Sequence, residues 1–194
     1  VRHAQEQGIF VVLIDTENAL DEAWLHALGV DTDESKLLKL NMAMIDDVAK
    51  TISEFMKSYK VLPEDEKPKV LFVLDSLGNL STTKEIEDSS EGKETRDMTR
   101  AQVIKSIFRI LSLKLGQAGI PLIVTNHTYE VVGAYVPTKE MGGGTGLKYS
   151  ASTILFLSKK KEKDGTEVVG NIIKVKAQKS RFTKENSDIE TRLF

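Results

Sequence analysis

The chain has 194 residues, of which 40% are hydrophobic and 29% charged, a length that suits one well-buried domain and is short for two. Its longest apolar runs, FVVLI and VLFVL, are much shorter than the roughly 20 residues that a membrane-spanning helix needs. We therefore do not expect a membrane protein. The absence of cysteine excludes a disulfide framework, a thiolate nucleophile and cysteine-ligated metal, and a net charge of −2 predicts no overall basic footprint for nucleic acid.

The first residues, VRHAQEQG, have the pattern of the last turns of a helix that Gly8 ends as its C-cap. The final residues, DIETRLF, read as a strand without a following loop, so we expect a domain core that lies within a longer protein. Apolar runs typical of strands occur at residues 9–14, 37–40, 70–74, 120–125, 151–157 and 168–175. Segments of helical period with one apolar stripe occur at residues 21–28, 45–59 and 99–115.

The alternation of strands and helices in the first part of the chain predicts an α/β fold with a parallel sheet covered on both faces. The dipeptide Asp164-Gly165 lies between the last two apolar runs and is a hairpin signal, so we expect antiparallel strands to extend this sheet. Two long loops are expected at residues 81–97, which are rich in charge, and 128–144, which contain four glycines. Loops of this length in a compact domain are usually functional or disordered.

Polar residues lie at the C-terminal ends of three of the apolar runs, at residues 15–17 (DTE), 75–76 (DS) and 126–127 (NH). In an open parallel sheet, ligands bind beyond the carboxyl ends of the strands, so these residues are candidates for a site. Asp75 ends a strand in the manner of a Walker B carboxylate, which holds Mg²⁺ usually through a water, although a helix or turn cap has the same pattern.

Glu17 is a candidate for the residue that orients and deprotonates a water attacking a γ-phosphate. The alternative interpretation is that Glu17 only makes a favourable electrostatic interaction with the N-terminal end of the next helix. His127 is a candidate phosphate sensor or general acid, with a simple loop histidine as the alternative. A Ser/His/Asp hydrolase is the rival chemistry. The chain has no G-x-S-x-G elbow, and Ser76 lacks the flanking glycines of such a turn.

A phosphate loop of the form G-x-x-x-x-G-K-[ST] is not found in the chain. The one glycine-rich stretch, MGGGTGLKYS, places Lys148 at the lysine position but has Leu147 for the second glycine and Tyr149 for the hydroxyl residue. Glycine-rich backbone that opens onto a short helix still suits a nucleic-acid phosphate, and a flexible linker is the alternative.

With these blocks assembled, the chain resembles the ATPase core of RecA-type recombinases, and most closely the branch found in tailed phages. The resemblance covers nearly the whole chain and rests on five ordered blocks, LIDTENALDEAWLHALGVD, VLFVLDSLGNL with KEIED and DMTRA, IVTNHTYE, MGGGTGLKYSA and KVKAQKSR. It implies a RecA-like P-loop ATPase core with a mixed, mainly parallel sheet flanked by helices and a C-terminal antiparallel hairpin extension. The family's phosphate loop would precede Val1, so the resemblance also implies that residues 1–194 alone bind nucleotide poorly.

The resemblance gives roles to the strand-end residues. Glu17 corresponds to the catalytic glutamate that activates water, and Asp75 to the Walker B aspartate at the Mg²⁺ of ATP. Asn126 and His127 fall where the family senses the γ-phosphate and couples it to the following loop; RecA itself has glutamine at the position of His127.

The resemblance also implies a DNA site and a contact between subunits. The two long loops correspond to the family's two DNA-binding loops. Lys179 and Arg181 match basic residues that reach the neighbouring subunit's phosphates, in the manner of an arginine finger. The positions that match DNA contacts, or in one case a stacking aromatic, are Lys105, Arg109, Tyr135, Gly143, Gly144 and Thr145.

The small net charge is a cancellation between two parts of the chain. Residues 1–137 have 15 basic and 22 acidic side chains, a net charge of −7, whereas residues 138–194 have 12 and 7, a net charge of +5. Lysines 159, 160, 161 and 163 flank the hairpin signal and are typical of an exposed sheet edge. Tyr129 and Tyr135 offer stacking groups in the second loop or only anchor it.

The sequence thus favours an ATP-dependent, DNA-dependent ATPase that exchanges DNA strands within a helical filament on single-stranded DNA. The expected partners are single- and double-stranded DNA, further copies of the protein, and mediator and single-strand-binding proteins, without a membrane. The expected location is the cytoplasm of a phage-infected bacterium. Two alternatives stay open: a non-catalytic RecA-like filament regulator, and a replicative helicase-like hexamer of the same fold.

Overall fold

A computed structural model describes residues 1–91, 99–130 and 139–193 of the chain. The chain folds into two compact units, Val1–Leu147 and Lys148–Phe194. Most of the predicted site residues belong to the first unit.

The first unit is built on a four-stranded parallel sheet of β1 (Phe10–Asp15), β2 (Leu37–Asn41), β3 (Val70–Asp75) and β4 (Leu122–Val124). The strand order is β2-β1-β3-β4. Within this sheet Asp15 pairs with Asp75 and also with Asn41, so the polar ends of three strands lie in one row. The predicted parallel sheet is confirmed, with strand bounds that differ by one or two residues.

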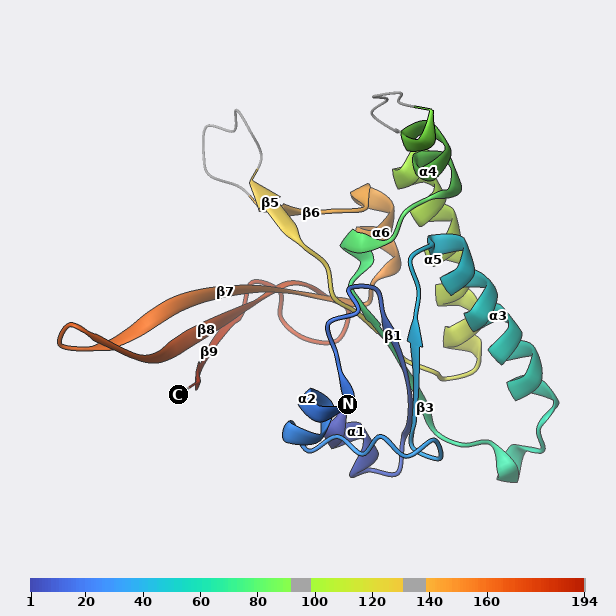
Figure 1. Cartoon of the computed structure of the whole chain (residues 1–194), viewed down its shortest axis with the longest axis horizontal. Helices are drawn as coiled ribbons and strands as arrows, with labels where there is room; N and C mark the ends of the chain where they lie inside the picture. Colours follow the sequence, from blue (N-terminus) through green and yellow to red (C-terminus); the bar gives the residue numbers. More distant parts are fainter. Residues whose placement is uncertain (92–98, 131–138, 194) are drawn as a thin grey trace. The chain divides into compact units, whose positions relative to one another are not determined.

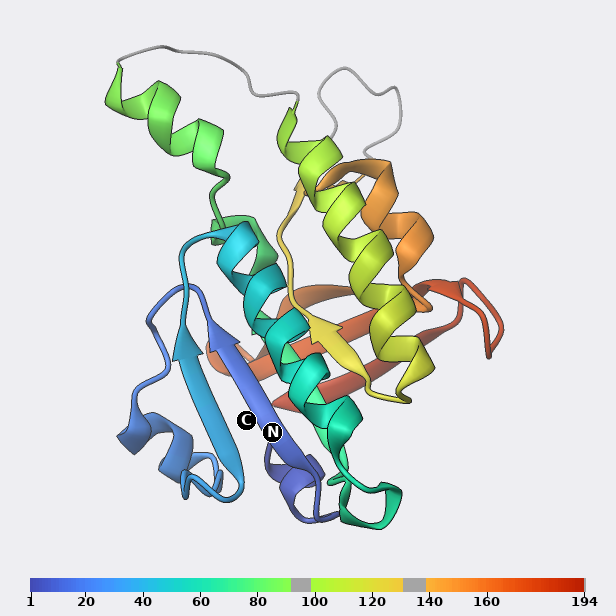
Figure 2. The same ribbon diagram turned by 90° about the vertical axis from the view of Figure 1, so that its right-hand side faces the viewer.

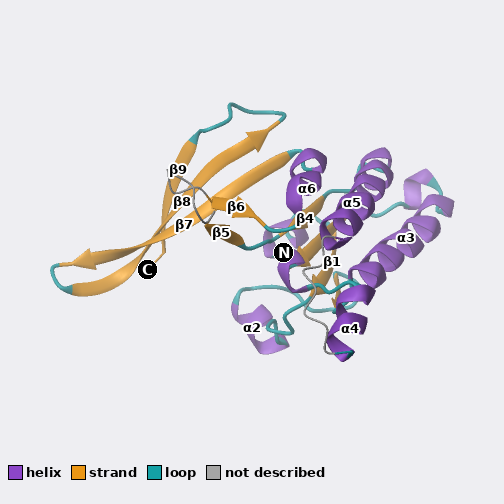
Figure 3. Ribbon diagram, turned by 90° about the horizontal axis from the view of Figure 1, so that it is seen from above, coloured by secondary structure: helices purple, strands orange, loops and turns teal. Residues whose placement is uncertain are grey.

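Helices cover both faces of this sheet, as the alternating apolar strands predict. On one face α3 (Ile45–Val61) and α5 (Thr99–Gln117) lie side by side over the even-numbered side chains of β1 and β3, among them Phe72 (Figure 2 and Figure 3). The opposite face packs Val11 and Leu13 against α2 (Glu22–Ala27) and the short α1 (Arg2–Gln5) (Figure 1). Gly8 has a φ of +70°, as expected of the residue that ends a helix.

The two segments predicted as long loops contain regular structure. The first, after the 3₁₀ turn η2 (Leu77–Asn79), contains α4 (Thr83–Ser90), so the expectation of an irregular loop is wrong there. A capping box explains this helix: the Thr82 hydroxyl accepts from the Glu85 N–H (3.2 Å) and the Glu85 carboxylate accepts from the Thr82 N–H (2.7 Å).

The second segment contains a two-stranded hairpin of β5 (Thr128–Glu130) and β6 (Lys139–Met141), followed by α6 (Gly144–Ser150). The expected short helix after the glycine-rich stretch is therefore confirmed. Residues 92–98 and 131–138 of these two segments lie outside the described residues.

The second unit is an antiparallel sheet of β7 (Thr153–Asp164), β8 (Glu167–Ser180) and β9 (Asp188–Leu193) in that order. The predicted hairpin is confirmed, with its turn at Gly165 and Thr166, one residue later than expected; Gly165 takes a φ of +59°, which suits the first central position of such a turn. The described strands form a separate sheet, so the expectation that they extend the parallel one is wrong. Both edges of β8 are filled, by β7 and by β9, and none of these three strands pairs with β4 in the described residues.

A further 3₁₀ turn, η1 (Glu64–Glu66), joins α3 to β3. No helix in the described part of the chain is long and apolar enough to cross a membrane.

Candidate functional site

The carboxyl ends of β1 and β3 are joined by hydrogen bonds that fix the loops after them. The Thr16 N–H donates to the carbonyl of Asp75 at 2.7 Å. The Thr16 hydroxyl accepts from the Ser76 N–H (2.8 Å) and donates to the Ser76 carbonyl (2.7 Å). One side chain therefore satisfies both backbone polar groups of Ser76, a residue that is only 3% exposed. The peptide bond between Asp75 and Ser76 is cis.

Asp15 organises the loop that carries Glu17. Its carboxylate is 1% exposed, accepts from the N–H groups of Glu17 and Leu20 (both 3.1 Å), and lies 3.4 Å from the Lys39 ammonium. Burial raises the pKa of Asp15, but the two N–H donors and Lys39 together outweigh it, so the pKa lies below its ordinary value. Asp15 is thus an ionised anchor that turns the chain toward Glu17.

The Glu17 carboxylate lies between groups from two other strand ends. The Ser76 hydroxyl donates to Glu17 Oε1 at 2.9 Å, and the Nε2 atom of His127 lies 3.7 Å from the same oxygen. The Glu17 side chain is 37% exposed and the His127 side chain 71% exposed, so solvent reaches this carboxylate. The strand ends that the sequence singles out are therefore brought together in the structure.

Asp75 is held by the end of β4. The Thr125 hydroxyl donates to Asp75 Oδ1, and the Thr125 N–H donates to the carbonyl of Leu74 at 3.0 Å. Among the described residues, none donates to the other oxygen of Asp75. Its position fits the expected role of a carboxylate that holds Mg²⁺ through water.

The described residues contain no group of three or more His, Asp or Glu side chains that could hold a metal by themselves. A single carboxylate such as Asp75, with one oxygen bound by Thr125, suits Mg²⁺, which takes one or two carboxylates and otherwise binds water and phosphate oxygens. No phosphate-cradling loop is present in the sequence, so Glu17 and Asp75 account for only the carboxylate part of a nucleotide site.

Asn126 ties the end of β4 to the glycine-rich segment. Its Oδ1 accepts from the N–H of His127 (3.0 Å), and its Nδ2 donates to the carbonyl of Gly142 (2.8 Å). The N–H of Gly142 donates in turn to the carbonyl of His127 at 3.2 Å. Asn126 and His127 are therefore hydrogen-bonded to the backbone of the glycine-rich segment at Gly142.

The glycine-rich segment needs its glycines for two physical reasons. Gly143 and Gly144 have φ values of +88° and +71°, a conformation that other residues adopt only with strain. At Gly146 a Cβ would meet the Lys105 side chain at 2.4 Å, so α6 packs closely on α5 because this position has no side chain.

The structure describes the side chains of only some of the predicted DNA-contacting residues in the first unit. Lys105 and Arg109 are exposed one turn apart on α5, which leaves both side chains accessible to a phosphate backbone. Thr145 lies in the first turn of α6, but its side chain is outside the described residues, as is Tyr135 altogether.

In the second unit, Lys179 lies at the end of α6. Its ammonium donates to the carbonyls of Lys148 (2.7 Å), Tyr149 (3.2 Å) and Ala151 (2.7 Å), and Arg181 reaches the Tyr149 carbonyl at 3.4 Å. Burial and the nearby Arg181 lower the pKa of Lys179. Lys179 therefore satisfies carbonyls that the end of the helix leaves without partners.

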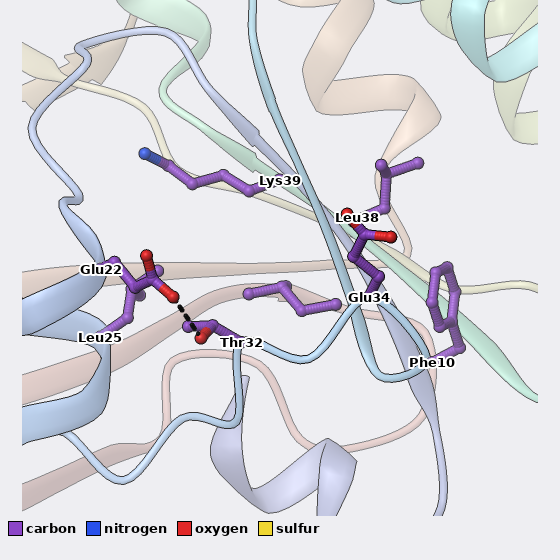
Figure 4. A pocket seen from close by; sticks show the side chains of 8 residues that line it. Phe10, Glu22, Leu25, Thr32, Glu34, Leu38 and Lys39 are labelled. Carbon is purple, nitrogen blue, oxygen red and sulfur yellow. Dashed lines mark hydrogen bonds between the residues drawn. The ribbon is translucent and has the colours of Figure 1, made fainter.

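A pocket of about 620 Å³ lies elsewhere in the first unit, beside β2 and α2 (Figure 4). Figure 4 shows Glu22 accepting a hydrogen bond from Thr32 across its rim. None of the predicted site residues lines it; its lining consists of Phe10, Glu22, Leu25, Thr32, Glu34, Leu37, Leu38 and Lys39.

Sequence reasoning counted Asp15, Thr16 and Ser76 among the strand-end candidates but assigned them no role in nucleotide chemistry, and it missed Gly78 and Thr125. Three of these five, Thr16, Ser76 and Thr125, are next to predicted site residues in the sequence, and Asp15 is two positions from Glu17, so proximity along the chain was their only signal. Gly78 carries another kind of information, because a Cβ there would lie 2.7 Å from the Cδ2 atom of His127.

The comparisons with known proteins all indicate the same family. The RecA N-terminal domain family matches residues 1–194. The "Recombination and repair protein" of Enterobacteria phage T4 is 35% identical over 173 residues, which are 89% of this chain and 42% of that protein. "Protein RecA" of Salinispora tropica is 31% identical over 187 residues (93% of this chain, 49% of that protein), and "Protein RecA" of Deinococcus radiodurans is 30% identical over 200 residues (100% and 51%).

The chain spans about half the length of the curated relatives that it matches. The match extends over all the blocks on which the resemblance rests, and it is independent of the strand-end geometry described above. The expected resemblance is confirmed: the chain belongs to the RecA N-terminal domain family.

Proposed function

We propose that this chain is the core of an ATP-dependent recombinase that exchanges DNA strands within a helical filament on single-stranded DNA. Such a protein serves homologous recombination, repair and recombination-dependent replication. The observation that carries the proposal is the arrangement around Glu17, whose carboxylate contacts Ser76 after β3 and faces His127 after β4. The relative from phage T4, which is named "Recombination and repair protein", supports the same function.

The chemistry at this edge is hydrolysis of ATP. Glu17 is exposed enough to bind a water molecule and accept its proton, while Ser76 occupies one of its oxygens and so limits how the carboxylate rotates. Asp75 would hold Mg²⁺ through water, and the metal would polarise the phosphate of the bound nucleotide. Thr125 keeps the Asp75 side chain in one orientation.

DNA binding is placed at the glycine-rich segment and the adjoining face of α5. Lys105, Arg109 and the backbone of Gly143, Gly144 and Thr145 contact phosphates, and Tyr135 stacks on or wedges between bases. Asn126 and His127 connect this site to the nucleotide, because Asn126 bonds to the backbone of Gly142 and His127 faces Glu17. Bound ATP then orders the DNA-binding loop and hydrolysis releases it.

Lys179 and Arg181 are proposed to contact phosphates bound by a neighbouring subunit. In the isolated chain the Lys179 ammonium is engaged by three carbonyls at the end of α6, so this contact requires Lys179 to exchange those acceptors for phosphate oxygens. The other proposed partners are double-stranded DNA and mediator and single-strand-binding proteins. Because one relative comes from phage T4, we propose the cytoplasm of an infected bacterium as the location.

The test uses the full-length protein. We expect Mg²⁺-dependent ATP hydrolysis that single-stranded DNA raises at least tenfold, and helical filaments on that DNA in negative-stain images. Closed rings on the same DNA would instead indicate the helicase-like alternative. Filament binding without any hydrolysis would indicate the non-catalytic regulator.

Replacing Gly78 by alanine is expected to lower DNA-stimulated hydrolysis by about tenfold. The new Cβ would lie 2.7 Å from the His127 ring, and this exposed ring can swing away at little cost in stability. We expect the midpoint of thermal unfolding to change by only a few degrees, because the clash falls on a movable side chain. A Gly116→Ala variant is the control, since nothing lies within 4 Å of a Cβ there. Unchanged stimulation in Gly78→Ala would contradict a role for His127.

A further inference from the structure

A single arginine at the start of α5 holds the turn that follows β3. The Nη2 atom of Arg100 donates to the carbonyls of Gly78 (3.0 Å) and Leu80 (2.9 Å), and it lies 3.5 Å from the carbonyl of Leu77. These three carbonyls belong to η2 and the residue after it. One guanidinium nitrogen therefore contacts backbone carbonyls from the start of the turn to the residue after it.

This turn and the residue before it make three contacts with the proposed catalytic edge. Ser76, which donates to Glu17, immediately precedes the turn, and the N–H of Leu77 donates to the carbonyl of Thr125 at 3.0 Å. Gly78 lies directly against the His127 ring. A shift of the turn would consequently change the surroundings of both Glu17 and His127.

The same arginine also faces the first predicted DNA-binding segment. Its Nε atom is 3.7 Å from Glu85 Oε1, too far for a hydrogen bond, and it is a buried atom with no hydrogen-bond partner among the described residues. Glu85 is the capping-box residue of α4, so the position of α4 decides how close its carboxylate comes to Arg100. A buried donor without an acceptor is costly, and a small approach of Glu85 would remove that cost.

Arg100 also lies on the helix that presents Lys105 and Arg109. These exposed residues follow it within three turns of α5. A DNA strand that contacts the exposed side chains of α5 would therefore act on Arg100 through this helix, although the guanidinium itself donates to backbone carbonyls.

We propose that Arg100 is a positioning residue that couples DNA binding on α5 to the turn behind Glu17. A shift of α5 on DNA closes the gap between Glu85 and Arg100, and Arg100 then fixes the turn of Leu77–Asn79 so that Ser76 and His127 hold Glu17 in its working orientation. This coupling rests on the proposed function. It differs from the Asn126 connection, since it acts through the start of α5.

The experiment compares Arg100→Met in the full-length protein with the unsubstituted protein. Methionine keeps much of the length of the side chain but removes every donor. We expect the ratio of DNA-stimulated to DNA-free ATP hydrolysis to fall about tenfold through kcat, while the concentration of DNA that gives half-maximal stimulation stays within about twofold. Lys114→Met is the matched control, because it removes a charge from the same helix at a residue that contacts Ser53 on α3, and its ratio should not change.

A second variant tests the α4 side. Glu85→Gln keeps an oxygen acceptor for the capping box but removes the charge that attracts Arg100, so we expect about a threefold fall in the same ratio. The double variant should be no worse than Arg100→Met alone, because both substitutions interrupt one connection. A ratio within twofold of the unsubstituted protein in Arg100→Met, or fully additive losses in the double variant, would overturn the proposal.

Amide hydrogen exchange of residues 76–80 separates this inference from the proposed function. In the unsubstituted protein a single-stranded oligonucleotide should slow exchange at these residues at least threefold, and in Arg100→Met it should not. If DNA fails to stimulate hydrolysis in the unsubstituted protein, the proposed function is wrong, but this exchange difference would still support the coupling. Equal exchange with and without DNA in the unsubstituted protein would overturn it.

Discussion

Replacing Glu17 by glutamine in the full-length protein is expected to lower ATP hydrolysis at least a hundredfold while ATP-supported binding to single-stranded DNA persists. Glutamine has nearly the same shape and can still accept the hydrogen bond from Ser76, but it cannot take a proton from water. Loss of a general base usually costs a factor of roughly 10² to 10⁴ in rate. Single-turnover hydrolysis and fluorescence anisotropy of a labelled oligonucleotide measure the two quantities separately.

Glu34→Gln is the control for this substitution. Glu34 is an exposed carboxylate that lines the pocket beside β2 and contacts none of the predicted site residues, so its removal should change neither quantity more than twofold. If Glu17→Gln keeps a tenth or more of the rate of ATP hydrolysis, Glu17 is not the general base. A simultaneous loss of DNA binding would mean that the substitution disturbs ATP binding or the filament itself.

The sequence was sufficient to predict the carboxylates of this site because parallel strands put their carboxyl ends at one edge. Asp75 closes a buried apolar run and Glu17 follows another, and the register pairs Asp75 with Asp15. No knowledge of side-chain conformation is needed for that step. The prediction of His127 beside them rests on the same rule and on the order of the motifs.

The contacts that orient these side chains could not be predicted in the same way. Thr16 and Ser76 are 60 residues apart, and their two hydrogen bonds depend on the backbone path after each strand. The role of Gly78 depends on how closely the turn approaches His127. Spacing along the sequence contains no information about either.

Short polar elements were missed for a different reason. The helix α4 has few apolar side chains and is specified mainly by the capping box of Thr82 and Glu85. The β5–β6 hairpin has strands of three residues each, too short for alternation to be visible. The roles of Lys179 and Arg181 in a neighbouring subunit's site are predictions from the family resemblance, and the hydrogen bonds of Lys179 within its own unit were not foreseen.

Replacing Asp15 by asparagine should lower the free energy of unfolding of the first unit by about 2–3 kcal/mol at pH 7, since the lost hydrogen bonds are to an ionised and almost fully buried acceptor. The amide Nδ2 of asparagine would face the N–H of Glu17 or Leu20, which pairs a donor with a donor, and Lys39 would lose its counter-charge. Urea unfolding followed by the fluorescence of Trp24, the single tryptophan of the chain and a residue of α2, measures the change.

The pH dependence of the free energy of unfolding shows whether Asp15 stabilises the fold through its charge or through its shape. Because the pKa of Asp15 in the folded protein lies below the ordinary value of about 3.9, its stabilising contribution is complete above that value and is lost as pH falls through the lower, folded pKa. The difference in the free energy of unfolding between the unsubstituted protein and Asp15→Asn should therefore be constant from about pH 5 to 8 and shrink below about pH 4. Asp65→Asn, an exposed control, should cost less than about 0.5 kcal/mol at every pH. A difference that persists undiminished in acid would show that the amide disturbs the loop by its shape, and that the ionised carboxylate is not what holds Glu17 in place.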